Sequence, residues 1–187
     1  LLAAYTPAGD MHVLLGDFTG HGLPAAVGAM PLAEVFYGMT AKGYGLAETL
    51  REMNAKLKRI LPVDMFCCAT LLCLSFSGRV VEVWNGGMPD GYLHRLATGE
   101  RVPLVSRHLP LGVLASSQFD DATEVWPMEL HDRVFLLSDG VIDTTDADEQ
   151  LFGAERLQQV FAHNHEPDML FEDIQQALAD FGGQSRD

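Results

Sequence analysis

The pattern of apolar and polar positions predicts a short strand, two helices, a block of strands and two further helices. Residues 11–16 form the short apolar strand. Residues 22–41 have helical spacing, and we expect Pro31 to kink this helix or to split it in two. In residues 46–61 the apolar side chains alternate with charged ones at helical intervals, which predicts an amphipathic helix.

The middle of the chain alternates apolar runs with turn residues, as β-strands do. We expect strands at residues 66–76, 79–84, 91–96, 123–126 and 133–137. The run at residues 66–76 is almost continuously apolar, so it should be a central strand covered on both faces. Short links between the runs indicate antiparallel neighbours.

The end of the chain returns to helical spacing, at residues 154–162 and 168–181. Helices, then strands, then helices indicate an α+β fold rather than an alternating parallel sheet. The chain has 187 residues without an internal repeat or a low-complexity linker, so we interpret it as one domain.

Composition and charge narrow the classes of partner. The formal net charge is −14, which argues against binding to nucleic acid or to anionic membrane surfaces. No apolar run approaches the roughly 20 residues that a membrane-spanning helix needs. Hydrophobic residues make up 48% of the chain, which is enough for a sizeable core.

The three cysteines favour a reducing compartment. Cys67, Cys68 and Cys73 lie within one apolar run and include no Cys-x-x-Cys pair. Neither a disulfide framework nor a zinc site is indicated. We expect buried thiols and a cytoplasmic protein.

Two aspartates carry the strongest functional signal in the sequence. Asp17 follows the strand at residues 11–16, and Asp139 follows the strand at residues 133–137. Each leads into a turn that contains glycine. Two carboxylates brought together repel, and a hard divalent cation such as Mg²⁺ or Mn²⁺ would offset that repulsion.

Each motif alone also has an ordinary structural explanation. The glycines at residues 16–22 are compatible with a plain strand-to-helix turn, and the segment 138–143 with a polar strand end. The charged segment 184–187, taken alone, is typical of a solvated tail. The residues by themselves leave both explanations open.

Together and in this order, six motifs resemble the metal-dependent protein phosphatases of the type 2C (PPM) family. The similarity is strongest to the bacterial SpoIIE/RsbU branch. The segment Gly-Asp-Phe-Thr-Gly-His-Gly resembles the branch's Gly-Asp-x-x-Gly-x-Gly, and Ser-Asp-Gly-Val its Ser/Thr-Asp-Gly-Val. The six matching segments are residues 16–22, 65–71, 85–89, 111–112, 138–141 and 151–153.

The resemblance implies a fold, a reaction and a cofactor. The family's fold is a four-layer sandwich of two antiparallel β-sheets flanked by helices. Its reaction is hydrolysis of phosphoserine or phosphothreonine by a water held between two Mg²⁺ or Mn²⁺ ions. Metals lower the pKa of such a water and neutralise charge on the phosphoryl group.

The resemblance also assigns roles to individual residues. Asp17 matches the aspartate that bridges both metals, and the carbonyl of Phe18 is expected to join one of them. Asp139 and Asp187 match the carboxylates that hold the other metal. Asp17, Asp139 and Asp187 are thus the expected catalytic set. Asp143 is a weaker candidate for a metal ligand or for a residue that contacts one.

Several departures from the branch are evident. The branch has a Gly-Gly-Asp motif before the first strand, whereas Asp10 lies in a Pro-Ala-Gly-Asp turn that predicts a hairpin. We expect the missing ligand to precede Leu1 and the terminal partner to follow Asp187. Residues 1–187 are therefore interpreted as one domain cut at both ends from a longer regulator. Met88 replaces the branch's usual histidine, which we expect to affect the substrate cleft.

The leading hypothesis is a phosphatase domain in bacterial signal transduction and sigma-factor regulation. Its implied substrate is a phosphorylated anti-sigma-factor antagonist, with a receiver or sensor domain upstream, as in a response regulator. The alternative is a pseudophosphatase that controls a stress sigma factor by protein binding alone. The three retained aspartates favour the enzyme. The sequence leaves a homodimer open.

Overall fold

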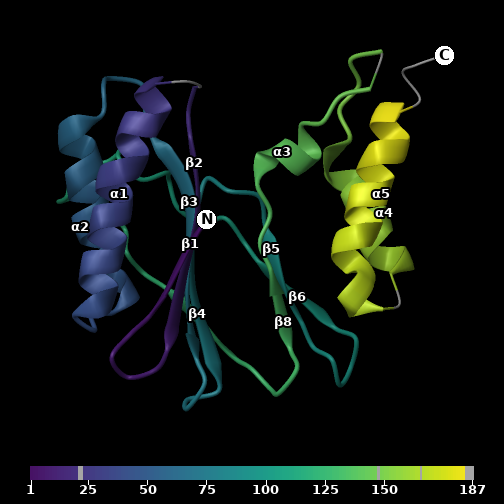
Figure 1. Cartoon of the computed structure of the whole chain (residues 1–187), viewed down its shortest axis with the longest axis horizontal. Coiled ribbons are helices and arrows are strands. Elements are labelled where there is room, and N and C mark those ends of the chain that lie inside the picture. Colours follow the sequence, from purple (N-terminus) through teal and green to yellow (C-terminus); the bar gives the residue numbers. More distant parts are fainter. Residues whose placement is uncertain (21–22, 147, 165, 184–187) are drawn as a thin grey trace. The chain divides into compact units, whose positions relative to one another are not determined.

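The computed structural model describes residues 1–20, 23–146, 148–164 and 166–183 (Figure 1). The chain forms two compact units, Leu1–Leu137 and Ser138–Asp187. The first unit contains both sheets and two long helices, and the second contains helices and turns. The interpretation of residues 1–187 as a single domain stays a prediction.

The first unit contains two antiparallel sheets. The larger sheet has the order β1-β2-β3-β4-β7 and comprises β1 (Leu2–Tyr5), β2 (Met11–Phe18), β3 (Cys67–Ser75), β4 (Val80–Gly86) and β7 (Glu124–Pro127). The smaller sheet has the order β6-β5-β8 and comprises β6 (Arg101–Leu104), β5 (Gly91–His94) and β8 (Arg133–Phe135). Among the described residues, every pair of neighbouring strands in the two sheets is antiparallel, as the short links predict.

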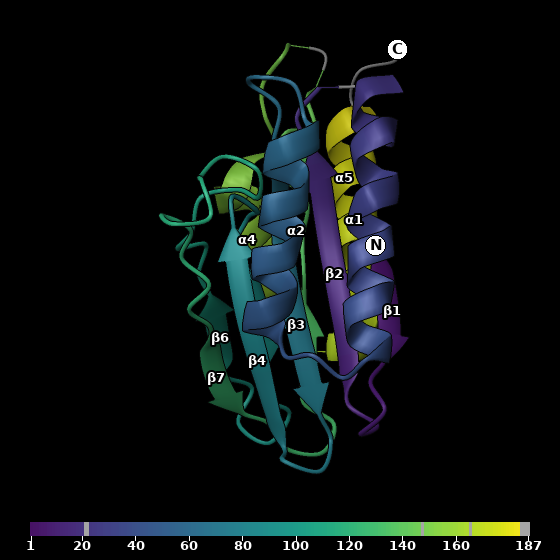
Figure 2. The same ribbon diagram turned by 90° about the vertical axis from the view of Figure 1, so that its left-hand side faces the viewer.

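Two helices cover one face of the larger sheet. Figure 2 shows α1 (Leu23–Ala41) and α2 (Leu46–Ile60) side by side over β2, β3 and β4. An apolar cluster fills the space beneath them, with Leu14, Phe36, Leu50, Leu71 and Trp84 among its members. Burial of this cluster attaches the helical layer to the sheet, because each buried aliphatic or aromatic side chain stabilises the fold by about 1.5–3 kcal/mol.

A second cluster joins the two sheets. It contains Leu72, Val81 and Val83 from the larger sheet, together with Leu93 and Leu104 from the smaller one. The larger sheet therefore has an apolar cluster on each face. Strand β3 lies at its centre between β2 and β4, which confirms the prediction of a central strand covered on both sides.

The helices of the first unit fit the sequence pattern with one correction. The helix α2 buries Leu46, Leu50, Met53 and Leu57 and exposes its charged face, as predicted. The helix α1 is continuous through Pro31, so of the two predicted outcomes, a kink or a split, the split is wrong. Proline lacks an N–H and costs one helical hydrogen bond, but packing of the buried face of α1 keeps the helix intact.

The hairpin and all six predicted strands are present, and one strand was missed. Strands β1 and β2 form the hairpin around the turn that contains Asp10, where the Thr6 N–H donates to the Asp10 carbonyl at 2.8 Å. Strand β6 was not predicted, because Arg101 and Pro103 interrupt its apolar pattern. A strand with proline is tolerated at a sheet edge, which is where β6 lies.

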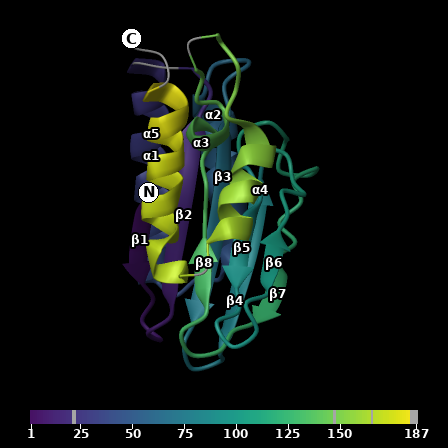
Figure 3. The ribbon, with the colours of Figure 1, turned by 90° about the vertical axis from the view of Figure 1, so that its right-hand side faces the viewer.

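The second unit consists of α3 (Asp139–Ile142), α4 (Gly153–His163), a 3-10 turn at Pro167–Met169 and α5 (Leu170–Gly183). Figure 3 shows α4 and α5, both of which the sequence predicted. The helix α5 begins two residues later than expected, after the 3-10 turn. Within the described part of the chain, no helix is long and apolar enough to cross a membrane.

A buried histidine links β2 to α1. The Nδ1 atom of His12 lies 3.1 Å from Oγ1 of Thr40, and both side chains are buried. Burial lowers the pKa of His12, although the carboxylates of Glu82 and Asp10 oppose this effect. The folded state thus favours the neutral imidazole.

We predict that the first unit loses stability in acid because of His12. The unfolded chain takes up a proton near the ordinary histidine pKa of about 6.5, whereas folded His12 resists it, so the free energy of unfolding should fall as pH drops below that value. Urea unfolding, followed by the fluorescence of Trp84 and Trp126, measures the free energy of unfolding at pH values above and below about 6.5. The variant His12→Asn should show a weaker pH dependence. An unchanged dependence in the variant would contradict the assignment.

Candidate functional site

The pairing of β2 with β3 fixes the position of Asp17. The ladder runs from Met11 opposite Leu74 to Phe18 opposite Cys67, and Asp17 lies opposite Cys68. Val13 packs against the cluster between the two sheets. Because side chains alternate along a strand, Asp17 lies on the same face as Val13 and is half-buried at the strand end.

Phe18 lies on the opposite face, towards the helices. Its ring packs against the cluster beneath α1 and α2. A Cβ atom at Gly28 of α1 would lie 2.5 Å from the ring of Phe18 and 3.0 Å from a methyl group of Leu61. Only glycine therefore fits at position 28 of α1, because the side chains of Phe18 and Leu61 occupy the space that a larger residue would need.

The turn after Asp17 is held by Thr19. Its N–H donates to the Phe66 carbonyl at 3.0 Å, and its Oγ1 accepts from the Phe66 N–H at 3.0 Å. Gly20 has φ of +84°, a backbone conformation that favours glycine. His21 and Gly22, which complete the motif, lie outside the described residues. The turn is thus anchored to the residue before β3.

The turn after β4 lies at the same end of the larger sheet. Gly87 has φ of +81°, and a Cβ atom there would lie 2.9 Å from Sγ of Cys68, the residue opposite Asp17. The side-chain amide of Asn85 donates to the Pro89 carbonyl at 3.1 Å and holds the turn closed. Two of the sequence motifs therefore meet at one end of the sheet.

Asp139 occupies the first position of α3, in the second unit. Its carbonyl accepts from the Asp143 N–H at 2.8 Å, and its side chain is exposed. A carboxylate in the first turn of a helix is favoured by the positive end of the backbone dipoles. Asp143, the weaker candidate, ends the same turn. Asp187 lies outside the described residues.

The metal site stays a prediction. The described residues contain no group of three His, Cys, Asp or Glu side chains placed to hold a metal ion. The predicted metal ligands do not all belong to one unit. Asp17 and Phe18 belong to the first unit and Asp139 to the second, while Asp187 lies outside the described residues. The donor chemistry suits Mg²⁺ or Mn²⁺, since carboxylate and carbonyl oxygens are the ligands these ions prefer.

The cysteines are free thiols, as predicted. Burial raises the pKa of Cys67 to about 12, with Cys68 and Asp17 adding to the effect. Burial also raises the pKa of Cys73 to about 11. Cys67 and Cys73 therefore stay protonated at neutral pH, which argues against either one as a covalent nucleophile.

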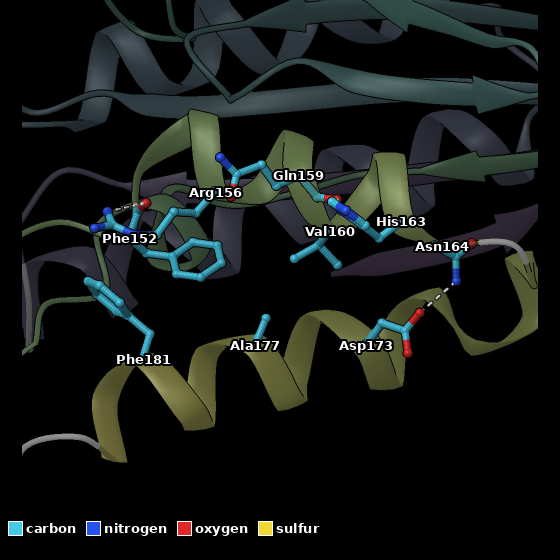
Figure 4. A pocket seen from close by; sticks show the side chains of 9 residues that line it. All are labelled: Phe152, Arg156, Gln159, Val160, His163, Asn164, Asp173, Ala177 and Phe181. Atoms are coloured by element: carbon cyan, nitrogen blue, oxygen red, sulfur yellow. Dashed lines mark hydrogen bonds between the residues drawn. The ribbon is translucent and has the colours of Figure 1, made fainter.

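A cavity of about 550 Å³ lies between α4 and α5, within the second unit. Figure 4 shows Val160 and Ala177 facing each other across its middle, with Arg156 near Phe181 at one end. Asn164 donates to Asp173 at 2.7 Å at the other end. Of the predicted site residues that the structure describes, none lines this cavity.

Sequence reasoning missed a second cavity, of about 510 Å³, at the C-terminal end of α2. Two of the matching motif segments, residues 65–71 and 111–112, contribute to its walls. Neither predicts a cavity, because the two wall segments lie far apart in the chain. The apolar Val63, in the loop between α2 and β3, is 90% exposed. Phe66, which holds the turn after Asp17, lines this cavity.

The chain is similar to known proteins over nearly its whole length. A family model described as Stage II sporulation protein E (SpoIIE) matches residues 7–187. The phosphoserine phosphatase RsbP of Bacillus subtilis (strain 168) is 23% identical over 137 residues, which cover 71% of this chain and 33% of RsbP. The chain thus spans about a third of the length of that relative.

Solved structures with low sequence identity share the fold. The SiaA-PP2C domain of Pseudomonas aeruginosa has a TM-score of 0.71 and 20% identity, covering 100% of this chain and 81% of that domain. The catalytic domain of the serine threonine protein phosphatase PstP, in complex with 2 manganese ions, has a TM-score of 0.61 and 16% identity, covering 91% of this chain and 82% of that one. The predicted PPM-type α+β fold, with two antiparallel sheets and helices, is confirmed.

The contact between Phe18 and Gly28 predicts opposite effects for two glycine substitutions in α1. Gly28→Ala should destabilise the first unit by about 1–3 kcal/mol, since the added methyl group overlaps the ring of Phe18. Gly38→Ala should stabilise it by up to about 1 kcal/mol, because nothing lies within 4 Å of its Cβ position and alanine favours the helix. Urea unfolding of both variants measures the difference. Equal effects would contradict the close contact.

Proposed function

The chain belongs to the Stage II sporulation protein E (SpoIIE) family, and on that premise we propose that it is a metal-dependent protein serine/threonine phosphatase. The proposal rests chiefly on Asp17, the last residue but one of β2, which lies beside two glycine-containing turns. The family model covers this residue and the other predicted ligands. RsbP is named as a phosphoserine phosphatase, which agrees with the proposed substrate chemistry.

Within this proposal, Asp17, the Phe18 carbonyl, Asp139 and Asp187 would hold Mg²⁺ or Mn²⁺. The metals supply the activation of a water and the neutralisation of charge on the phosphoryl group. Water adds to phosphorus, the bond from phosphorus to the serine or threonine oxygen breaks, and that oxygen takes a proton. No covalent bond to the protein forms. The phosphate is released as the second product.

The chain's own residues would orient the reactants. Asp17 is held by the β2–β3 ladder, and the turn after it is fixed by the paired hydrogen bonds between Thr19 and Phe66. Such anchoring matters because catalytic groups act only when held close to the productive geometry. Asp17 and the Phe18 carbonyl are adjacent on this anchored segment, so they would be positioned together.

The proposed substrate is a phosphorylated anti-sigma-factor antagonist or a similar regulatory protein. This part of the proposal rests on the likeness to RsbP and to the SpoIIE family. A receiver or sensor domain in the same protein would control the activity. We place the protein in the cytoplasm and in sigma-factor regulation.

We predict that Asp17→Asn and Asp139→Asn each weaken Mn²⁺ binding by more than about tenfold. Loss of a residue that only hydrogen-bonds to a metal ligand already lowers metal affinity by about 10- to 100-fold, so loss of a ligand itself should lower it at least as much. The rate of phosphate release from p-nitrophenyl phosphate should fall together with the Mn²⁺ affinity. Isothermal titration measures the metal affinity of the complete protein, and circular dichroism checks the fold. Asp10→Asn is the matched control, because Asp10 lies in the hairpin turn and should leave both properties unchanged.

Two results would overturn the proposal in different ways. Mn²⁺ affinity that is equal in the wild type and in Asp17→Asn would remove Asp17 from the metal site. Metal binding without any phosphate release, even from a phosphorylated regulatory protein, would favour the non-catalytic adaptor instead.

A further inference from the structure

The cavity at the C-terminal end of α2 is built from residues that the proposed reaction does not use. Its volume is about 510 Å³, within the size range of pockets that bind small molecules or side chains. Its walls are the last turns of α2, the loop before β3 and a short segment before β7. The lining residues are Lys58, Leu61, Pro62, Val63, Asp64, Met65, Phe66, Gly112 and Val113.

Hydrogen bonds hold the walls of this cavity in place. Leu111 and Cys67 exchange two backbone hydrogen bonds, each 2.9 Å long. The buried Asn54 accepts from the Gly112 N–H at 2.9 Å and donates to the Leu114 carbonyl at 3.1 Å. The Lys58 ammonium donates to the Val113 carbonyl at 2.9 Å. The cavity is therefore preformed between α2 and the segment before β7.

Two contacts join the cavity to the segment that carries Asp17. Phe66, in the cavity wall, forms the paired hydrogen bonds with Thr19. Leu61, also in the wall, lies close to the position where Gly28 meets the ring of Phe18. The cavity thus adjoins the proposed metal-binding turn from the side of the helices.

The lining is mainly apolar, and its edge is cationic. The apolar members are Leu61, Pro62, Val63, Met65, Phe66 and Val113. Within the described part of the chain, neither Lys58 nor the adjacent Arg59 has a carboxylate partner, whereas Arg51 and Lys56 of the same helix are paired. Asp64 contributes one opposing carboxylate. The last turn of α2 therefore carries two cations, Lys58 in the lining and Arg59 next to it in the sequence, against the one lining carboxylate of Asp64.

The loop at the mouth of the cavity has a special conformation. Asp64 has φ of +69°, which costs free energy for a residue other than glycine. The turn is closed by the Met65 N–H, which donates to the Pro62 carbonyl at 3.2 Å. It projects Val63 outwards, where 90% of that residue is exposed. Val63 therefore continues the apolar lining of the cavity out to its mouth.

We propose that this cavity is a docking pocket for the protein substrate, and that it takes an apolar side chain from an acidic segment of that substrate. The apolar walls fit the side chain, and Lys58 and Arg59 attract the flanking carboxylates. The inference rests on the proposed phosphatase activity, because it makes the pocket a specificity site beside the reaction. An acidic partner would be repelled by most of the chain's surface, so these cations would also direct its approach.

Labelled phosphoserine peptides test the pocket. One peptide carries glutamates and a leucine near the phosphoserine, and its partner replaces that leucine by serine. The wild-type protein should bind the leucine peptide about tenfold more tightly, because burying one leucine is worth at least that factor. Fluorescence anisotropy measures binding whether or not hydrolysis occurs, and turnover of the same peptides should show the difference in KM rather than in kcat.

Val63→Asp should remove the preference for leucine, because it puts a carboxylate in the apolar lining. Arg59→Glu should weaken the binding of both glutamate peptides by a similar factor, because it reverses one of the two charges that attract them. Both residues are exposed, so neither substitution disturbs the core. Val125→Asp and Lys42→Glu are the matched controls, at exposed positions outside the pocket, and should change neither the preference nor the affinity. Hydrolysis of p-nitrophenyl phosphate should stay unchanged in all four variants. If the wild type hydrolyses no phosphate ester, the proposed function fails, and the anisotropy result still decides the pocket. Equal binding of both peptides by the wild type, a leucine preference that survives Val63→Asp, or an unchanged affinity in Arg59→Glu would overturn the docking pocket.

Discussion

The antiparallel ladder between β2 and β3 is the constraint on which the candidate site depends. It pairs Met11 with Leu74 at one end and Phe18 with Cys67 at the other. A slip of one residue would turn every side chain of β2 to the opposite face. Leu14 would then leave the cluster under the helices, and Asp17 would point into it. Burial on both faces of the larger sheet fixes the register and therefore the side on which the carboxylate lies.

The same ladder places two adjacent residues in different surroundings. Asp17 lies on the face towards the second sheet, while the ring of Phe18 packs among the helices near Gly28 and Leu61. A displacement of α1, or of the end of α2, would reach the Phe18 backbone through this ring. The proposed ligands Asp17 and the Phe18 carbonyl would move with it. The packing of the helical layer is therefore connected physically to the proposed chemistry.

The sequence predicted those elements whose burial is periodic. The spacing of Leu46, Leu50, Met53 and Leu57 identified α2, and the continuous apolar run identified the central β3. Strand β6 was missed because its short edge position tolerates Arg101 and Pro103. Of the kink or split predicted for α1 at Pro31, the split was wrong, since tertiary packing outweighed one lost hydrogen bond.

The sequence predicts the candidate site as a list of residues and not as an arrangement. Local motifs point to Asp17 and Asp139, because a glycine-containing turn follows each strand, and their role stays a prediction. The hydrogen bonds from Thr19 to Phe66 join segments 47 positions apart, and no local pattern reveals them. The cavity beside α2 escaped notice for the same reason, since its walls come from distant parts of the chain. Long-range contacts of this kind depend on the fold.

The central claim is that Asp17 and Asp139 hold a common divalent cation. The most direct test is anomalous diffraction from crystals of the protein grown with Mn²⁺. The account predicts an anomalous peak within coordination distance of both carboxylates. A fully occupied Mn²⁺ elsewhere, with neither carboxylate bound to metal, would contradict it.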